Sequence, residues 1–166
     1  MESNGIKNNG KGVSMYSLRK VKTFIGNEGQ GFNAELLRDA KPVAFVIDSA
    51  QGGEFEYQWY GGGNAEMLKL REFAKAQPPV KSGEFTLEMD MDLYVGSLLD
   101  AYLEDRQKRN WCKTKCVFRL KSDKKGEYRT IPAPRNNPGF IVKCIAGLKE
   151  KYGDSIEEIL NEKYQA

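Results

Sequence analysis

The fold is decided by residues 17–60, which read SLRKVKTFIGNEGQGFNAELLRDAKPVAFVIDSAQGGEFEYQWY. Short runs rich in β-branched and aromatic residues alternate there with turn residues, and no helical period fits them. The glycine-rich segment 26–31 predicts a hairpin turn rather than a phosphate-binding loop, because a strand and not a helix follows it. The stretch therefore predicts a four-stranded antiparallel meander. The predicted strands are 18–25, 32–38, 43–47 and 54–60.

Alternation along these strands predicts which side chains share a face of the sheet. In the first strand it places Lys20 on the same face as Leu18. The third strand is almost continuously apolar, which indicates a central strand covered on both faces. In the fourth strand one face carries the aromatic residues Phe55, Tyr57 and Trp59. We expect that aromatic face to lie over the core.

Helical patterns take over after residue 60, so the predicted fold class is α+β. Apolar stripes predict helices over 65–76, 91–110 and 138–152, and a capping-box pattern from Asp154 to Glu157 predicts a short last helix. A strand over 83–87 and a basic hairpin over 115–131 complete the predicted elements. The domain organisation we expect is a flexible tail over 1–14 and a single domain over 15–166.

The composition is that of a folded protein. The chain has 166 residues, 40% of them hydrophobic, 30% charged and 11% aromatic, which argues against disorder. No window approaches 18 uninterrupted apolar residues, and the N-terminal residues lack the apolar region of a secretory signal. We therefore expect a soluble cytoplasmic protein with no membrane association.

The chain contains no histidine. Histidine is the commonest general base and metal ligand near neutral pH, so its absence excludes Ser-His-Asp and Cys-His nucleophilic sites and most zinc sites. An enzyme would have to act through carboxylates, Lys, Tyr or an oxygen-bound metal ion. We predict a protein without catalytic residues and without a cofactor.

Two sets of side chains have the chemistry to bind a metal ion, and each has a simpler interpretation. Cys112, Cys116 and Cys144 are an odd number of thiols, with no fourth soft ligand to complete a zinc site. We therefore expect reduced thiols, with Cys116 and Cys144 as small buried apolar residues on a strand and on a helix face. Glu88, Asp90 and Asp92 alternate as magnesium ligands would in a strand. They also stand where a helix begins, and acids there cap free N–H groups and complement the helix dipole.

Charge changes sign sharply in the second half of the chain. Residues 82–105 carry seven acids and no base, for a net charge of −7, whereas residues 106–129 carry ten bases and two acids, for +8. The candidate binding residues belong to these two segments. They are Arg106, Lys108, Arg109, Trp111, Lys113, Arg119, Lys121, Lys124, Lys125 and Arg129 of the basic segment, with Glu88, Asp90 and Asp92 of the acidic one.

The basic segment has three interpretations. With Trp111 and Tyr128 beside it, it suits phosphates and stacked bases of a single-stranded nucleic acid. It also suits an acidic protein surface. The third interpretation is a solvated helix end and hairpin whose charges keep the protein soluble. Phe118 alternates onto the apolar face of its strand, so we expect it in the core and not on a base.

Several stretches of the chain resemble uncharacterised small proteins of bacteriophages and other mobile elements. They are residues 22–34, 38–48, 52–55, Trp59, 151–154, 157–158 and 160–162. The resemblance contains no catalytic motif and transfers no active-site residue. It implies a non-enzymatic anti-defence protein, in the cytoplasm of a bacterial host, that binds and inhibits a host protein or ribonucleoprotein complex such as a CRISPR effector. The alternative function is a single-stranded nucleic-acid-binding protein that uses the basic hairpin and aromatic residues.

Overall fold

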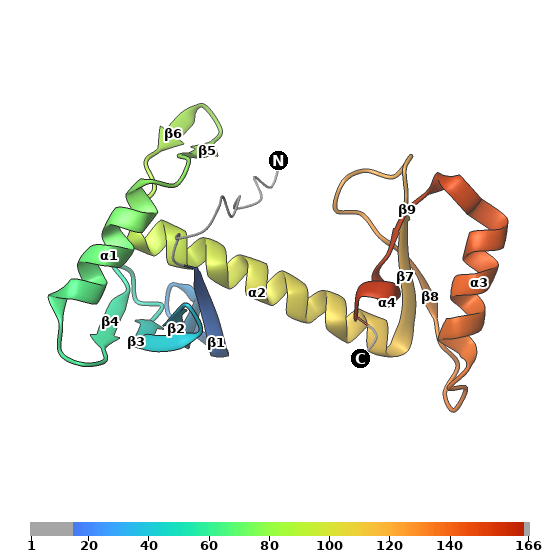
Figure 1. Ribbon diagram of the computed structural model, residues 1–166, viewed down its shortest axis with the longest axis horizontal. Coiled ribbons are helices and arrows are strands. Elements are labelled where there is room, and N and C mark those ends of the chain that lie inside the picture. The colour runs from blue at the N-terminus through green and yellow to red at the C-terminus, as the bar shows by residue number, and fades with distance from the viewer. Residues whose placement is uncertain (1–14, 165–166) are drawn as a thin grey trace. The chain divides into compact units, whose positions relative to one another are not determined.

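The computed structural model describes residues 15–164, which divide into two compact units between Asp100 and Ala101 (Figure 1). Unit 1 contains the described residues up to Asp100, and unit 2 contains those from Ala101. The sequence patterns indicate one domain, and the tail predicted over 1–14 lies outside the described residues. The dividing point falls inside one continuous helix, α2 (Met91–Thr114), where no turn residue marks it.

The four-stranded meander predicted for residues 17–60 is confirmed. Strands β1 (Tyr16–Gly26), β2 (Gly29–Arg38), β3 (Lys41–Asp48) and β4 (Glu56–Trp59) form one antiparallel sheet in that order. The first turn needs glycine because Gly29 has a φ of +113°, a conformation that L side chains rarely adopt. Gly29 is therefore a turn former, as predicted, whereas Gly31 lies within β2, where a Cβ would come within 2.5 Å of the Phe24 ring and the Asp48 carbonyl.

Two helices cover one face of this sheet. Helix α1 (Asn64–Lys75) and the first turns of α2 bring Phe73 and Tyr94 to Tyr16 of β1, with ring centroids 5.1 and 6.1 Å from the Tyr16 ring. Beneath them lie Phe32, Ala34, Leu36, Ala44 and Val46, all at most 1% exposed. Between the helices, the single strand predicted over 83–87 is a hairpin of β5 (Val80–Ser82) and β6 (Phe85–Leu87).

A β-bulge at Lys20 changes the predicted faces of β1. Lys20 has a φ of +52°, and the pairing with β2 shifts between Arg19 and Lys22. The extra residue lets Val21 join Leu18 on the buried face, while Arg19 and Lys22 stand opposite Glu35 and Asn33. The prediction that Lys20 shares the face of Leu18 is therefore wrong, because strict alternation does not survive a bulge.

Strand β3 is central, as predicted, but the helices cover only one of its faces. Val46 is fully buried beneath them, whereas Phe45 and Ile47 on the other face are half-buried. The second face of the sheet therefore stays partly open.

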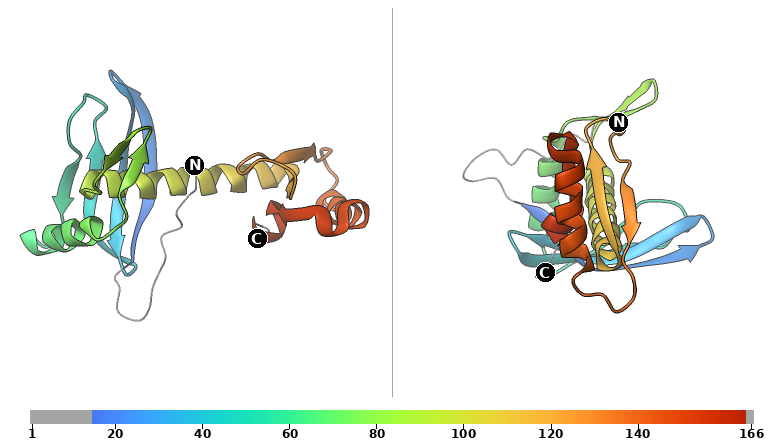
Figure 2. Two further views of the ribbon diagram at one scale, coloured as in Figure 1. Left: turned by 90° about the horizontal axis from the view of Figure 1, so that it is seen from above. Right: turned by 90° about the vertical axis from the view of Figure 1, so that its right-hand side faces the viewer.

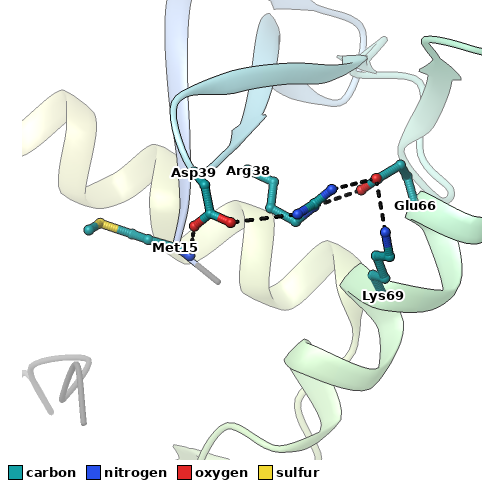
Figure 3. A network of polar contacts seen from close by, with 5 residues as sticks. All are labelled: Met15, Arg38, Asp39, Glu66 and Lys69. Carbon is teal, nitrogen blue, oxygen red and sulfur yellow. Dashed lines mark hydrogen bonds and ion pairs between the residues drawn. The ribbon is translucent and has the colours of Figure 1, made fainter. Parts of the chain in front are cut away.

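An ion-pair network ties the end of β2 to α1 (Figure 3). The Arg38 guanidinium donates to both carboxylate oxygens of Glu66, at 2.9 and 2.6 Å, and Lys69 lies 3.3 Å from the same group. This geometry lowers the pKa of Glu66, chiefly through the hydrogen bonds from Arg38. Asp39, beside Arg38, accepts a hydrogen bond from the backbone N–H of Met15 at 2.9 Å. The network fixes the first described residue and α1 to the same end of the sheet.

Unit 2 is a three-stranded sheet with a helix on one face (Figures 1 and 2). Strand β7 (Lys115–Leu120) lies between β8 (Arg129–Pro132) and β9 (Ile156–Ile159), and all pairs are antiparallel. Helix α3 (Phe140–Tyr152) packs on this sheet, with Leu148 against Cys116, Phe118 and Leu120 of β7. The predicted basic hairpin and the helix after it are confirmed.

The short helix predicted from Asp154 is wrong over most of its length. A 3₁₀ turn (Gly153–Ser155) and strand β9 occupy that segment, and the helix α4 (Leu160–Tyr164) begins only afterwards. The sequence IEEI fits a helix or a strand equally, and pairing of Phe118 with Ile159 and of Leu120 with Ile156 decides for the strand. Tertiary pairing here overrides a local capping pattern.

Asn161 is a buried polar residue that hydrogen-bonds to three backbone groups of unit 2. It is fully buried, and its Oδ1 accepts a hydrogen bond from the Val117 N–H at 2.7 Å. Its amide donates to the carbonyls of Lys115 and Cys112 at 2.8 and 3.3 Å. One side chain thereby bonds to backbone groups at the end of α2 and at the start of β7.

Replacing Asn161 with Ala is expected to destabilise the protein by about 2–3 kcal/mol, because it leaves buried backbone groups unpaired. Urea unfolding followed by circular dichroism measures the loss. The matched control is Asn110→Ala, since Asn110 is exposed and its side chain accepts a hydrogen bond from exposed Lys113 at 3.0 Å. Equal unfolding midpoints for the two variants would contradict this role of Asn161.

Candidate nucleic-acid interface

Positive charge is concentrated in the second unit. Residues 101–166 contain 15 Lys and Arg against 9 Asp and Glu, a net charge of +6, whereas residues 1–100 contain 11 against 14, a net charge of −3. The net charge of the whole chain is therefore only +3, although its second unit is basic. Such a distribution is the electrostatic signature that favours an anionic partner.

Neighbouring carboxylates occupy about half of the predicted cationic residues. On α2, Lys108 lies 2.7 Å from Glu104. The other close pairs are Arg109 with Asp105 at 2.8 Å, Arg129 with Asp123 at 2.7 Å and Arg119 with Glu158 at 3.8 Å. Arg109 and Arg129 are exposed and Lys108 and Arg119 are half-buried, and in each case the nearby carboxylate reduces the charge that the cation offers a ligand.

The turn between β7 and β8, residues 121–127, presents unpaired cations; we call it the lysine turn. Lys121, Lys124 and Lys125 are exposed, and within residues 15–164 none of them lies within 4 Å of a carboxylate. Asp123 braces the turn by accepting from the Leu120 N–H at 3.0 Å and from Arg129 at 2.7 Å. The hydrogen bonds from Arg129 lower the pKa of Asp123, so its carboxylate stays ionised to a lower pH than that of an ordinary Asp. Three lysines are thus held on a fixed turn.

Two aromatic rings adjoin the lysine turn. Tyr128, at its end, lies with its ring centroid 6.4 Å from that of Trp111, and both side chains are half-buried. The Tyr128 hydroxyl donates to Glu158 at 2.7 Å, and the Lys108 ammonium lies 5.4 Å from the Tyr128 ring centroid. Phe118 is 3% exposed and lies in the core, as predicted.

The remaining predicted cations lie on α2. The Arg106 guanidinium lies 5.9 Å from the Tyr102 ring centroid, and Lys113 donates to Asn110. Both residues are exposed. Their charges are free of close carboxylates among the residues that the structure describes, as are those of the lysine turn.

Two of the three predicted acidic site residues have structural roles. Asp90 caps α2 by accepting from the Leu93 N–H at 2.8 Å. Asp92 accepts from the Phe55 N–H at 2.8 Å and from the Tyr57 hydroxyl at 2.7 Å, and burial together with this bond raises the pKa of Tyr57. Glu88 is exposed. Within residues 15–164 no three acidic or thiol side chains are grouped to hold a metal ion.

Replacing Asp92 with Ala is expected to cost about 2–3 kcal/mol of stability, because a buried hydroxyl and a backbone N–H lose their acceptor. The control is Glu88→Ala, which removes an exposed carboxylate and is expected to leave the midpoint unchanged. Thermal unfolding with and without magnesium measures both. A magnesium-dependent rise in the wild-type midpoint that Asp92→Ala abolishes would contradict the structural role and favour a metal site.

The cysteines lie together in unit 2 as free thiols. Cys116 is fully buried and packs against Cys144, and burial first, then the neighbouring thiols, raises its pKa to about 12. A thiol of that kind is a weak nucleophile and a poor metal ligand. The prediction that Cys116 is a buried apolar residue is confirmed, whereas Cys144, predicted to be buried, is half-buried.

The face of the first sheet that α1 and α2 leave uncovered is the second candidate surface; we call it the open face. Cross-strand pairing places two rows of side chains on it, one through Arg19, Glu35, Phe45 and Gln58 and one through Lys22, Asn33, Ile47 and Glu56. Most of these side chains are exposed or half-buried. The face combines cations with apolar and amide groups.

A shallow hollow of about 400 Å³ lies on the open face. Its lining residues are Lys20, Lys22, Asn33, Glu35, Phe45 and Tyr60. Glu35 accepts from Arg19 at 2.6 Å and from Tyr60 at 3.4 Å, and Lys20 lies 3.4 Å away. The hydrogen bond from Arg19, with that from Lys20, lowers the pKa of Glu35.

No sequence pattern predicts this hollow. No residue within 19–22 predicts the bulge at Lys20. Without the bulge, strict alternation places the cations of β1 on the wrong faces of the sheet. Tyr57 and Trp59 of β4 lie on the opposite, helix-covered face, where they stack with centroids 5.4 Å apart, which confirms the prediction that this aromatic face lies over the core.

Comparisons with protein-family models, with curated proteins and with solved structures found no match. No helix within residues 15–164 is both long and apolar enough to cross a membrane.

Proposed function

We propose that the protein is a non-enzymatic binding protein whose second unit binds the phosphate backbone of a single-stranded nucleic acid. The observation that carries this proposal is the lysine turn, where Lys121, Lys124 and Lys125 project from a hydrogen-bonded turn without carboxylate partners among residues 15–164. Phosphate contacts of this type supply most of the sequence-independent affinity of nucleic-acid-binding proteins.

The surroundings of the turn support a nucleic acid over a small anion. Trp111 and Tyr128 offer half-buried rings close to the cations, and base stacking on such rings adds affinity that phosphate alone does not supply. The net charge of +6 over residues 101–166 attracts a polyanion at long range. The fixed geometry of the turn reduces the entropy lost when its lysines bind.

The triple variant Lys121→Ala/Lys124→Ala/Lys125→Ala is expected to weaken binding to a fluorescent single-stranded oligonucleotide. For single strands, the slope of log K against log salt changes by about 0.7 for each phosphate contact, so losing three contacts reduces its magnitude by about 2. Fluorescence anisotropy over a series of salt concentrations measures the slope.

The control variant Lys41→Ala/Lys75→Ala/Lys81→Ala removes the same charge from exposed positions of unit 1. We expect it to lower affinity slightly and to leave the slope unchanged. Equal slopes for the two triple variants, or no binding by the wild type at low salt, would contradict the proposal.

We propose inhibition of a host defence complex as a second candidate function, favoured by the β5–β6 hairpin. Val80 pairs with Leu87 and Ser82 with Phe85, which places Val80, Phe85 and Leu87 on one face of the hairpin. Their exposed fractions are 37%, 75% and 45%. An isolated hairpin with an exposed apolar face suits a protein partner, and the neighbouring Glu84 and Glu88 favour a basic rim on that partner.

The variant Phe85→Ser/Leu87→Ser is expected to abolish such inhibition without destabilising the protein, since both side chains are already exposed. Phage infection of bacteria with an active CRISPR-type defence, with and without the expressed protein, measures it. Ile25→Ser/Val142→Ser, at positions 82% and 64% exposed, is the control. Full inhibition by the hairpin variant, or none by the wild type, would reject this candidate.

A further inference from the structure

The hollow on the open face combines features that together suit one kind of ligand. It lies in unit 1, apart in sequence from the lysine turn, and the proposed phosphate contacts do not use it. Its lining provides two rings, an amide, an ionised carboxylate and two ammonium groups. We propose that the hollow holds one unstacked nucleobase of a bound single strand, an inference that rests on the proposed nucleic-acid binding.

The rings provide the stacking surface. Phe45 stands in the middle of β3 and is half-buried, and Tyr60 follows β4 and is 42% exposed. A planar base is the natural partner for such rings because every base has a π-face, and an aliphatic ligand would gain less. A double helix keeps its bases stacked, so the ligand has to be single-stranded.

The polar groups suit the edge of a base and the adjoining phosphate. Glu35 is held ionised by Arg19 and is an acceptor only, so it favours a base with an exocyclic amino group. Asn33 offers both a donor and an acceptor. Lys22 is an exposed ammonium group of the lining and suits the adjoining phosphate, whereas Lys20 is paired with Glu35 at 3.4 Å and offers the phosphate less charge.

The backbone of β1 supports a binding role for this region. Lys20 adopts a positive φ, which is uncommon for a residue other than glycine and carries strain. The bulge there brings Lys20, Lys22 and Arg19 toward the same face as Glu35. Bulges that redirect side chains in this way are frequent beside binding sites.

The test compares two decamers that carry the same phosphates, one of deoxycytidine and one of abasic sites. We expect the wild type to bind the deoxycytidine decamer at least about 5-fold more tightly, because stacking of one base in the hollow supplies about 5- to 100-fold and stacking on Trp111 and Tyr128 adds to it. Tyr60→Ala is expected to reduce this preference by the part that the hollow supplies, to leave the part due to Trp111 and Tyr128, and to bind the abasic decamer as the wild type does. Retained abasic binding shows that the variant is folded.

Phe45→Leu, which keeps an apolar side chain in the hollow, is expected to reduce the same preference. The control is Phe85→Ala, which removes an aromatic ring 75% exposed on the β5–β6 hairpin and is expected to leave the preference unchanged. Equal wild-type affinity for both decamers would overturn the base site while leaving the lysine turn intact. An unchanged preference in both hollow variants would also overturn it, and no binding of either decamer would overturn the proposed function as well.

Discussion

A side chain on a β-strand reaches only one face of its sheet, and one extra residue in β1 decides which side chains reach the open face. The bulge at Lys20 lets Leu18 and Val21 both enter the core. These residues are three positions apart, so strict alternation would place them on opposite faces of the sheet. On the other face it leaves Arg19 and Lys22 opposite Glu35 and Asn33. The buried packing of Tyr16 against α1 and α2 and the chemistry of the hollow both depend on this single register change.

A comparable constraint acts in unit 2, where β7 is hydrogen-bonded on both edges and needs support at its first residues. Asn161 supplies it from beyond β9, a long way along the chain. Because β7 is anchored at both ends, the turn that follows it starts from a fixed position, and Lys121 is further tied by its N–H to the Ser155 carbonyl at 2.9 Å. The rigidity of the lysine turn therefore derives from buried polar contacts rather than from the turn sequence alone.

Local sequence patterns predict much of the fold, and the predictions that are wrong share one cause. Strand and helix patterns and the glycine turns are local, so the meander, α1, α2 and α3 follow from them. The bulge at Lys20 and strand β9 depend on pairing with distant strands, and no local residue signals them. One part of the site was readable and was missed: Glu104 and Asp105 precede Lys108 and Arg109 by four residues, the spacing of helical ion pairs.

Some cations are paired with carboxylates and others are not, and this difference affects how the lysine turn and the hollow would bind a ligand. A lysine on an exposed turn contributes to affinity through counterion release, which depends on salt and not on the identity of the base. The ionised Glu35 and the rings of the hollow would act through hydrogen bonds and stacking, which depend on the base and little on salt. Because the two contributions differ in physical origin, they are separable by measurement even though both would serve one ligand.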